Sequence, residues 1–209
     1  MTEKMSKKTT GRAEILARLR AASAQDRVNA KPYRPQLQGD LKAKFFSKAQ
    51  AADANVHEIA SIEAIPTKLQ SLFAEGDNQT PLHIAQASLA RDLAWECAPK
   101  LNLHDTPPGG EALALSIADY GIAETGTLAF LSGAARPSSW HFLPGIECVV
   151  LRTTLIVPTL EDLFAQIADA GLPSTLNFVT GPSRTADIEQ TIERGAHGPR
   201  ALHIFMTGD

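Results

Sequence analysis

Glu124 is a candidate for chemistry because it lies in the glycine-rich loop formed by residues 119–127. Gly126 follows it closely, and a residue without a side chain lets a ligand approach the backbone. Thr125 and Thr127 add hydroxyls that could orient a carboxylate or its substrate. These residue types suit Glu124 as a base or a nucleophile. A tight turn that carries one surface glutamate has the same pattern, so both interpretations stay open.

A second polar loop, residues 180–189, has the residue types of an anion site. A sharp turn at Gly181 would let backbone N–H groups converge with the hydroxyls of Ser183 and Thr185 on one point. Arg184 adds a planar cation that matches the geometry of a carboxylate or a phosphate. The alternative is a helix start capped by Ser or Thr, with its charges in solvent.

Two further side chains complete the set of candidates. Asp187 could orient Arg184 or bind a donor group of a substrate, which makes it the second catalytic candidate beside Glu124. His197 lies on a glycine-rich turn before the last predicted strand and could act as an acid, a base or a ligand donor. A polar surface histidine is the alternative there. No zinc-protease motif, CxxC pair, GxGxxG loop or Walker loop is present, so neither a metal nor a dinucleotide is predicted.

Composition excludes several classes of protein. The 209 residues are 44% hydrophobic and 21% charged, which are values of a folded globular chain. A net charge of −3 lacks the basic footprint of a nucleic-acid-binding protein. No apolar run approaches the roughly 20 residues that a bilayer demands and no secretion signal follows the start, so a cytoplasmic protein is predicted. Cys97 and Cys148 are too few for an iron–sulfur cluster, and both are expected to be reduced core thiols.

Periodicity divides the chain into an N-terminal arm and a main body. Residues 11–22 predict a helix, and the prolines in 26–39 predict a non-helical linker, so 1–39 form the arm and 40–209 one α/β domain. Helices are predicted from Asp40, along Ile62–Leu72, around Leu89–Leu93 and over 159–170, where Thr159 and Asp162 form a capping box ahead of the stripe Leu160, Leu163, Phe164 and Ile167. Strands are predicted at 56–59, 82–85, 113–118, 127–131, 148–151, 154–157, 175–180 and 201–206.

This alternation of strands and helices predicts a three-layer α/β domain with a largely parallel or mixed sheet. Residues 113–131 and 148–157 could contain antiparallel pairs. The carboxyl ends of parallel strands meet at one edge of a sheet. We therefore expect residues 124–127 and 181–187 to meet at that edge, with Arg184 facing Glu124.

Three segments together resemble the signatures of one family. Residues 118–128 (ADYGIAETGTL), 180–189 (TGPSRTADIE) and 195–199 (GAHGP) are similar, in order and spacing, to motifs of the LUD-domain family. The likeness covers the body from residue 40 onward. The opening helix resembles the arm of the family's branch of lactate-utilisation C proteins.

The resemblance carries expectations that composition and spacing do not. It implies a fold similar to the group of glucosamine-phosphate isomerases, ribose-phosphate isomerases and CoA transferases. It also implies a non-redox role in the bacterial oxidation of L-lactate to pyruvate, with a small anionic ligand, and with iron–sulfur clusters on partner proteins and no cofactor on this chain. An acyl- or CoA-transferase-like, or phosphosugar-type, enzyme that uses Glu124 is the alternative. Whether the chain is an enzyme and whether it forms a homo-oligomer are left open.

Overall fold

The computed structural model describes residues 3–22, 35–74, 76, 79–133, 137–168, 171, 173–186, 192–195 and 197–208. The chain divides into two units, Met1–Tyr33 and Arg34–Asp209, which are described separately. The first unit contains α1 (Glu3–Ala22), which begins eight residues before the predicted helix. Ile15, Leu16 and Leu19 are all exposed on it. The predicted division at residues 39 and 40 stays a prediction.

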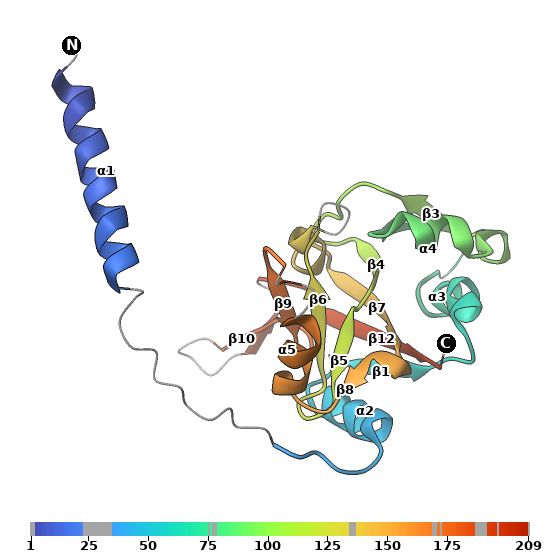
Figure 1. The fold of residues 1–209 in the computed structure, drawn as a ribbon. Coiled ribbons are helices and arrows are strands. Elements are labelled where there is room, and N and C mark those ends of the chain that lie inside the picture. Colours follow the sequence, from blue (N-terminus) through green and yellow to red (C-terminus); the bar gives the residue numbers. More distant parts are fainter. Residues whose placement is uncertain are drawn as a thin grey trace. The chain divides into compact units, whose positions relative to one another are not determined.

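The second unit is built on a six-stranded sheet in which every neighbouring pair of strands is parallel. Its order is β1 (Asn55–Glu58), β12 (Ala201–Thr207), β7 (Ile146–Arg152), β4 (Leu113–Ile117), β2 (Thr80–Ile84) and β3 (Leu101–His104). The four interior strands contribute fully buried apolar side chains, among them Leu82, Leu115, Val150 and Phe205. The predicted mixed α/β fold with a mostly parallel sheet is therefore confirmed (Figure 1).

The remaining strands do not extend this sheet, because they form a second sheet that sequence periodicity did not predict. Its order is β8 (Ile156–Val157), β5 (Tyr120–Ile122), β6 (Thr127–Leu131) and β9 (Leu176–Val179). β6 pairs antiparallel with β5 and β9, whereas β8 pairs parallel with β5. The expected antiparallel pair within 113–131 is thus β5 with β6. The first two residues of the predicted strand 154–157 instead belong to a 3₁₀ turn (Thr153–Leu155).

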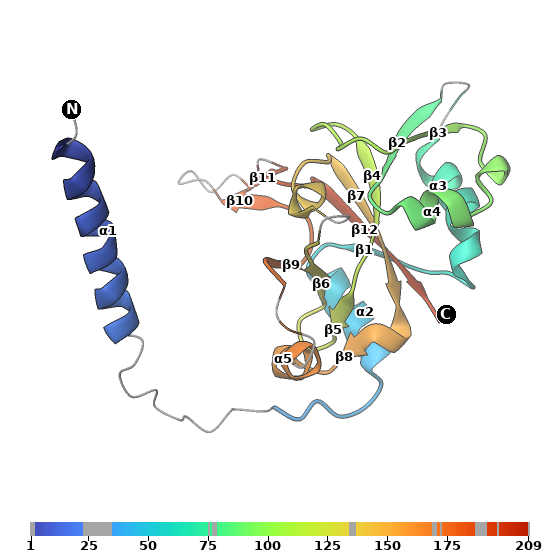
Figure 2. The same ribbon diagram turned by 45° about the horizontal axis from the view of Figure 1, so that its top comes forward.

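A separate two-stranded ribbon joins β10 (Arg184–Ala186) to β11 (Ile192–Arg194) in antiparallel register. Figure 2 shows this ribbon near the start of β12. Two hydrogen bonds hold the ribbon in this position, because Ser183 N donates to Pro199 O at 2.8 Å and Gly195 N donates to Ser183 O at 3.1 Å.

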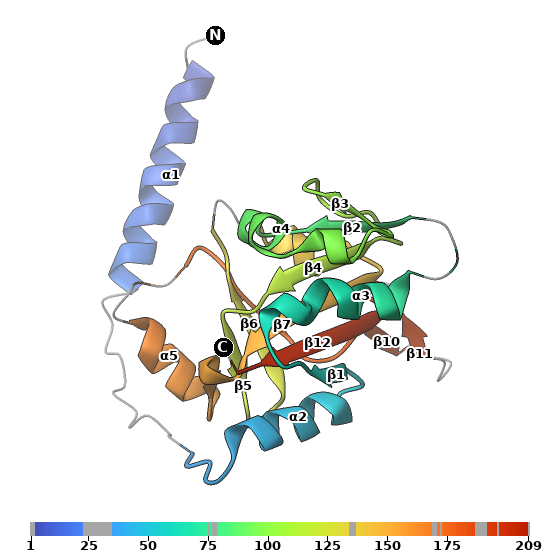
Figure 3. The same ribbon diagram turned by 90° about the vertical axis from the view of Figure 1, so that its right-hand side faces the viewer.

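Helices cover the outer faces of both sheets. α3 (Ile65–Phe73) and α4 (Ala87–Asp92) pack on one face of the parallel sheet, where Leu69 and Leu89 join the cluster around Phe205. Figure 3 shows α3 in front of β7 and β12. The opposite face packs against the second sheet and α2 (Leu41–Ala51), whose Phe45 is fully buried. Among the described residues, no helix has the length and apolar character needed to cross a membrane.

Local signals explain where these helices begin. The Asp40 side chain accepts from Ala43 N at the start of α2, and Pro66 lies in the first turn of α3 as its missing N–H requires. In α5 (Leu160–Ala168), Asp162 N donates to the Thr159 hydroxyl, which confirms the predicted cap.

The apolar stripe predicted for α5 is only half correct. Leu163 and Ile167 are buried against the second sheet, whereas Leu160 and Phe164 are 38% and 42% exposed. Only the side of the stripe that carries Leu163 and Ile167 packs against the second sheet.

Candidate functional site

The structure joins the two predicted loops through a chain of three hydroxyls. Thr125 Oγ1 lies 2.7 Å from Thr127 Oγ1, which lies 2.6 Å from Thr180 Oγ1. Thr127 begins β6 and Thr180 follows β9, and these strands are antiparallel neighbours. The two loops therefore lie close together, as expected, because β6 and β9 pair.

The meeting point is at the other end of the parallel sheet from the one expected. Ser183 is bonded to Pro199, just before β12 begins, and Gly181 contacts Ala52, just before β1 begins. The second loop therefore lies at the amino ends of β1 and β12. The expectation of the carboxyl edge was wrong because β9, which leads into the loop, belongs to the second sheet.

The two signature glycines have a packing reason. Gly126 has φ +69° and Gly181 has φ +71°, a region that favours glycine. A Cβ atom on Gly126 would lie 2.2 Å from Ala49 N, and one on Gly181 would lie 1.9 Å from Ala52 O. Both loops therefore press directly on the backbone at the end of α2.

A backbone N–H group of the second loop that was expected to face an anion, and another in the first loop, are bonded within the protein. Gly126 N donates to Ile122 O at 2.9 Å, and Ser183 N donates to Pro199 O. Neither N–H group is available to an anion in this arrangement.

The charged candidates lie on the surface around this junction. Arg184 forms an ion pair with Asp53 rather than facing Glu124 as expected. Glu124 is exposed on the turn between β5 and β6, and its N–H donates to Pro158 O at 3.0 Å. His197 is also exposed. Asp187 and the side chain of Thr185 lie outside the described residues. The roles proposed for these residues stay predictions.

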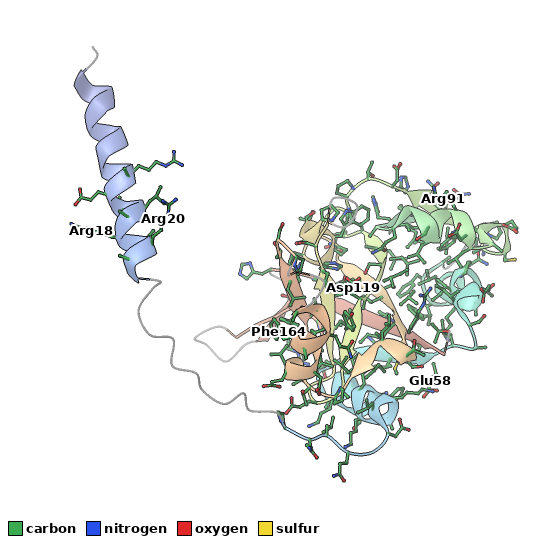
Figure 4. The ribbon with its side chains drawn as sticks, viewed as in Figure 1. Arg18, Arg20, Glu58, Arg91, Asp119 and Phe164 are labelled. Atoms are coloured by element: carbon green, nitrogen blue, oxygen red, sulfur yellow. The ribbon has the colours of Figure 1, made fainter. Side chains whose placement is uncertain are left out.

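A polar recess that the sequence did not reveal lies between the two sheets. Its lining residues are Gln86, Ile117, Asp119, Phe130, Leu131, Ser132, His141 and Asn177. The recess measures about 200 Å³ including its open mouth, and its interior volume of about 10 Å³ suits one water molecule or one ligand oxygen. Asp119, labelled in Figure 4 within the α/β unit, accepts from Leu131 N at 2.7 Å.

A buried acid–base pair stands behind one wall of the recess. His141 Nδ1 lies 2.7 Å from Glu147 Oε1, and the two residues are 6% and 0% exposed. Burial raises the pKa of Glu147, while the hydrogen bond and charge of His141 and a contact with Ser116 oppose that rise. Phe130 stacks on the His141 ring with 3.7 Å between ring centroids.

This pair had a weak signal in the sequence. Glu147 interrupts the apolar run of β7, where a charged side chain has to be buried and therefore needs a partner. Its partner His141 comes from a 3₁₀ turn (Ser138–His141) whose placement no periodicity predicts.

Comparison with known proteins identifies related chains. Residues 112–206 match the family model of the LUD domain. The protein named Lactate utilization protein C of Halalkalibacterium halodurans is 37% identical over 100 residues, which cover 45% of this chain and 44% of that protein. Its namesake in Geobacillus kaustophilus is 33% identical over 135 residues, covering 62% of this chain and 52% of that protein. The chain thus spans about half the length of these curated relatives.

Two further relatives extend the likeness. The uncharacterized protein YkgG of Escherichia coli is 29% identical over 179 residues, covering 79% of this chain and 73% of that protein. A crystal structure of a DUF162 family protein from Deinococcus radiodurans superposes with a TM-score of 0.58 and 19% identity, covering 83% of this chain and 100% of that one. This last likeness supports the fold. The expected similarity to the isomerases and CoA transferases stays a prediction.

Proposed function

We propose that this chain, whose residues 112–206 match the LUD-domain family model, is a non-redox component of lactate utilisation that binds a small carboxylate and works with iron–sulfur partner proteins. The observation that carries the proposal is the match of residues 112–206 to the LUD domain, together with relatives named Lactate utilization protein C. Those residues contain all three signature loops.

The exposed side chains at the junction support separate sites for partner contact and for binding of a small ligand. Glu124, Thr125, Arg184 and His197 are exposed around the junction of the signature loops. Mixed charges at an exposed rim suit recognition of a folded partner more than enclosure of a small molecule. We assign the junction to contact with the iron–sulfur partners, and a small ligand to an enclosed site elsewhere.

The electron-transfer centre belongs to the partners in this proposal. The two cysteines of the chain cannot supply the four ligands of a cluster. The partners would carry electrons from lactate, and this chain would hold a carboxylate beside them.

Capture and growth test the proposal together. A tagged copy recovered from lactate-grown cells of the source organism should bring down iron–sulfur proteins, and deletion of the gene should prevent growth on lactate while growth on glucose persists. Arg184→Ala should reduce the capture. Lys42→Ala is the matched control, since Lys42 forms a surface ion pair with Glu58 away from the loops. Intact growth of the deletion strain on lactate, with no iron–sulfur protein captured, would reject the proposal.

The alternative of a covalent acyl enzyme depends on Glu124. A nucleophilic carboxylate needs groups that orient the substrate and stabilise developing charge. The N–H groups of Gly126 and Ser183 at the junction are bonded within the protein. No observation therefore favours this alternative over the proposal.

A further inference from the structure

The polar recess lies where the order of the parallel sheet reverses. After β2 the next strand of this sheet is β3, at one edge, whereas after β4 the next are β7 and β12, toward the other edge. Connections that diverge from adjacent parallel strands leave a crevice at their carboxyl ends, which is where open α/β sheets bind ligands. Gln86 directly follows the end of β2, and Ile117 and Asp119 lie at the end of β4, so the recess occupies this crevice.

A neighbouring recess lies at the same edge and shares Ile117 with the polar recess. It measures about 490 Å³ including its open mouth, and its charged lining residues are Arg152, at the end of β7, Glu63 and Asp92. Charged side chains of both signs therefore lie next to the crevice.

Four side chains in the walls of the polar recess can donate, beside the Asp119 carboxylate, which accepts from Leu131 N. Asn177 Nδ2 is buried without a hydrogen-bond partner. The Ser132 hydroxyl accepts from Thr175 N at 2.9 Å, which leaves its hydrogen to donate. The Gln86 carbonyl accepts from Ile117 N at 3.2 Å, so its amide nitrogen remains for another acceptor. A buried donor without a partner is costly, and an oxygen acceptor in the recess would remove that cost.

The Glu147–His141 pair supplies a further donor. When the pair holds one proton between Glu147 Oε1 and His141 Nδ1, that proton can lie on either atom. In both cases the imidazole ring of His141 carries a hydrogen on Nε2, which can donate. Burial favours this net-neutral pair, because an unpaired charge in the core is costly. Glu147 is thus a positioning residue for His141, which itself lines the recess.

From this geometry we propose that the recess binds the carboxylate or carbonyl oxygen of a small 2-hydroxy or 2-oxo monocarboxylate, with Asn177, Ser132 and His141 as donors. The interior has room for one ligand oxygen, and the whole recess for only a few further atoms. The ligand class rests on the proposed role in lactate utilisation. The position of the site rests on the recess alone.

Titration calorimetry with the full chain tests the site. L-lactate, pyruvate, 2-oxobutyrate, propionate and inorganic phosphate are the probes. L-lactate or pyruvate should bind, and propionate, which lacks the oxygen on C2, should bind at least several-fold more weakly. Asn177→Asp replaces a donor by a negative acceptor of the same shape and should weaken binding about tenfold or more. Asn102→Asp is the control, since Asn102 is exposed on β3.

A second measurement uses the wild-type chain, so its result does not depend on whether a variant folds. In the wild-type chain, the imidazole NMR signals of His141 should shift when the ligand is added, while those of the exposed His197 should not. His141→Gln assigns the signal, and Ser132→Ala should weaken binding several-fold without disturbing the circular dichroism spectrum.

The outcomes separate the site from the function. Binding of lactate or pyruvate that Asn177→Asp and Ser132→Ala leave unchanged would overturn the site and leave the proposed function standing. Binding of a different 2-oxo acid alone, lost in both variants, would support the site and count against the role in lactate utilisation. Binding of phosphate alone, or of no probe, would overturn the ligand class and with it this inference.

Discussion

Thr127 Oγ1 and Thr180 Oγ1 lie 2.6 Å apart although 53 residues separate them in the chain. A contact between two hydroxyls at this distance is a hydrogen bond, and Thr127 contributes to it from a nearly buried position. It joins two of the three segments that resemble LUD-domain signatures. In this chain, the two threonines therefore hold the segments together through a direct hydroxyl contact.

This bond should be measurable as a coupling. Thr127→Val should lower the free energy of unfolding by about 0.5–1.5 kcal/mol, because a buried hydrogen bond is lost. Thr180→Val should cost less when Thr127 is already Val, and urea unfolding of the double-mutant cycle measures the difference. Thr154→Val, at an exposed position, is the control. Fully additive effects would show that the bond does not stabilise the fold.

Gly181→Ala should be strongly destabilising. The substitution forces a side chain into positive φ and against the Ala52 carbonyl, so a loss of about 2 kcal/mol or more in unfolding free energy is expected. Gly133→Ala should change little, because no atom within 4 Å would meet its Cβ. Equal unfolding midpoints for the two variants would contradict the close packing of this loop on α2.

The two faces of α5 should respond differently to truncation. Leu163→Ala removes a fully buried side chain and should cost about 2–5 kcal/mol. Phe164→Ala, at a position 42% exposed, should cost only about 0.5 kcal/mol. Thermal unfolding measures both. A larger loss for Phe164 would mean that this surface has a partner.

The two cysteines should differ in reactivity. Burial raises the pKa of the Cys148 thiol well above its ordinary value, and the charge of Glu147 adds to this rise. Cys97, contrary to the expectation of a core thiol, is exposed. A thiol reagent at about pH 8 should label Cys97 in the native chain and Cys148 only after unfolding. Native labelling of Cys148 would show that this part of the sheet opens.

His203 should make stability depend on pH. Burial, and then the charge of His57, lower its pKa to about 4, and Phe73 packs edge-on against its ring. The unfolded chain keeps the ordinary value of 6.5 and binds the proton more tightly, so stability is fully present above about pH 6.5 and falls toward about pH 4. His203→Phe should flatten the decline of the urea midpoint between these values. His197→Ala, at an exposed turn, should leave the decline unchanged.

Sequence periodicity predicted most elements because their signals are local. The bounds of β6 were predicted without error. The N-terminal caps of α2 and α5 are hydrogen bonds between residues only three positions apart in the chain. β3, β5, β10 and β11 were missed. β5 has only three residues, too short for an alternating pattern to be distinguished from a loop.

The candidate site was harder to predict because it depends on which strands pair. The two predicted loops do come together, although 120–122 and 184–186 within them form β5 and β10, and the second sheet turns them toward the amino ends of β1 and β12. Arg184 therefore met Asp53, at the end of α2, instead of Glu124. The polar recess draws Gln86, His141 and Asn177 from distant parts of the chain, and no spacing could have brought them together.

The position of β12 between β1 and β7 has a consequence for synthesis of the chain. Among the described strands, β1 is paired with β12 alone, and residues 59–200 emerge from the ribosome between them. Until residues 201–207 appear, β1 lacks this neighbour and β7 has an open edge that can pair with another nascent chain. The sheet is therefore completed late in synthesis, and the edge of β7 stays unpaired until the last strand has been made.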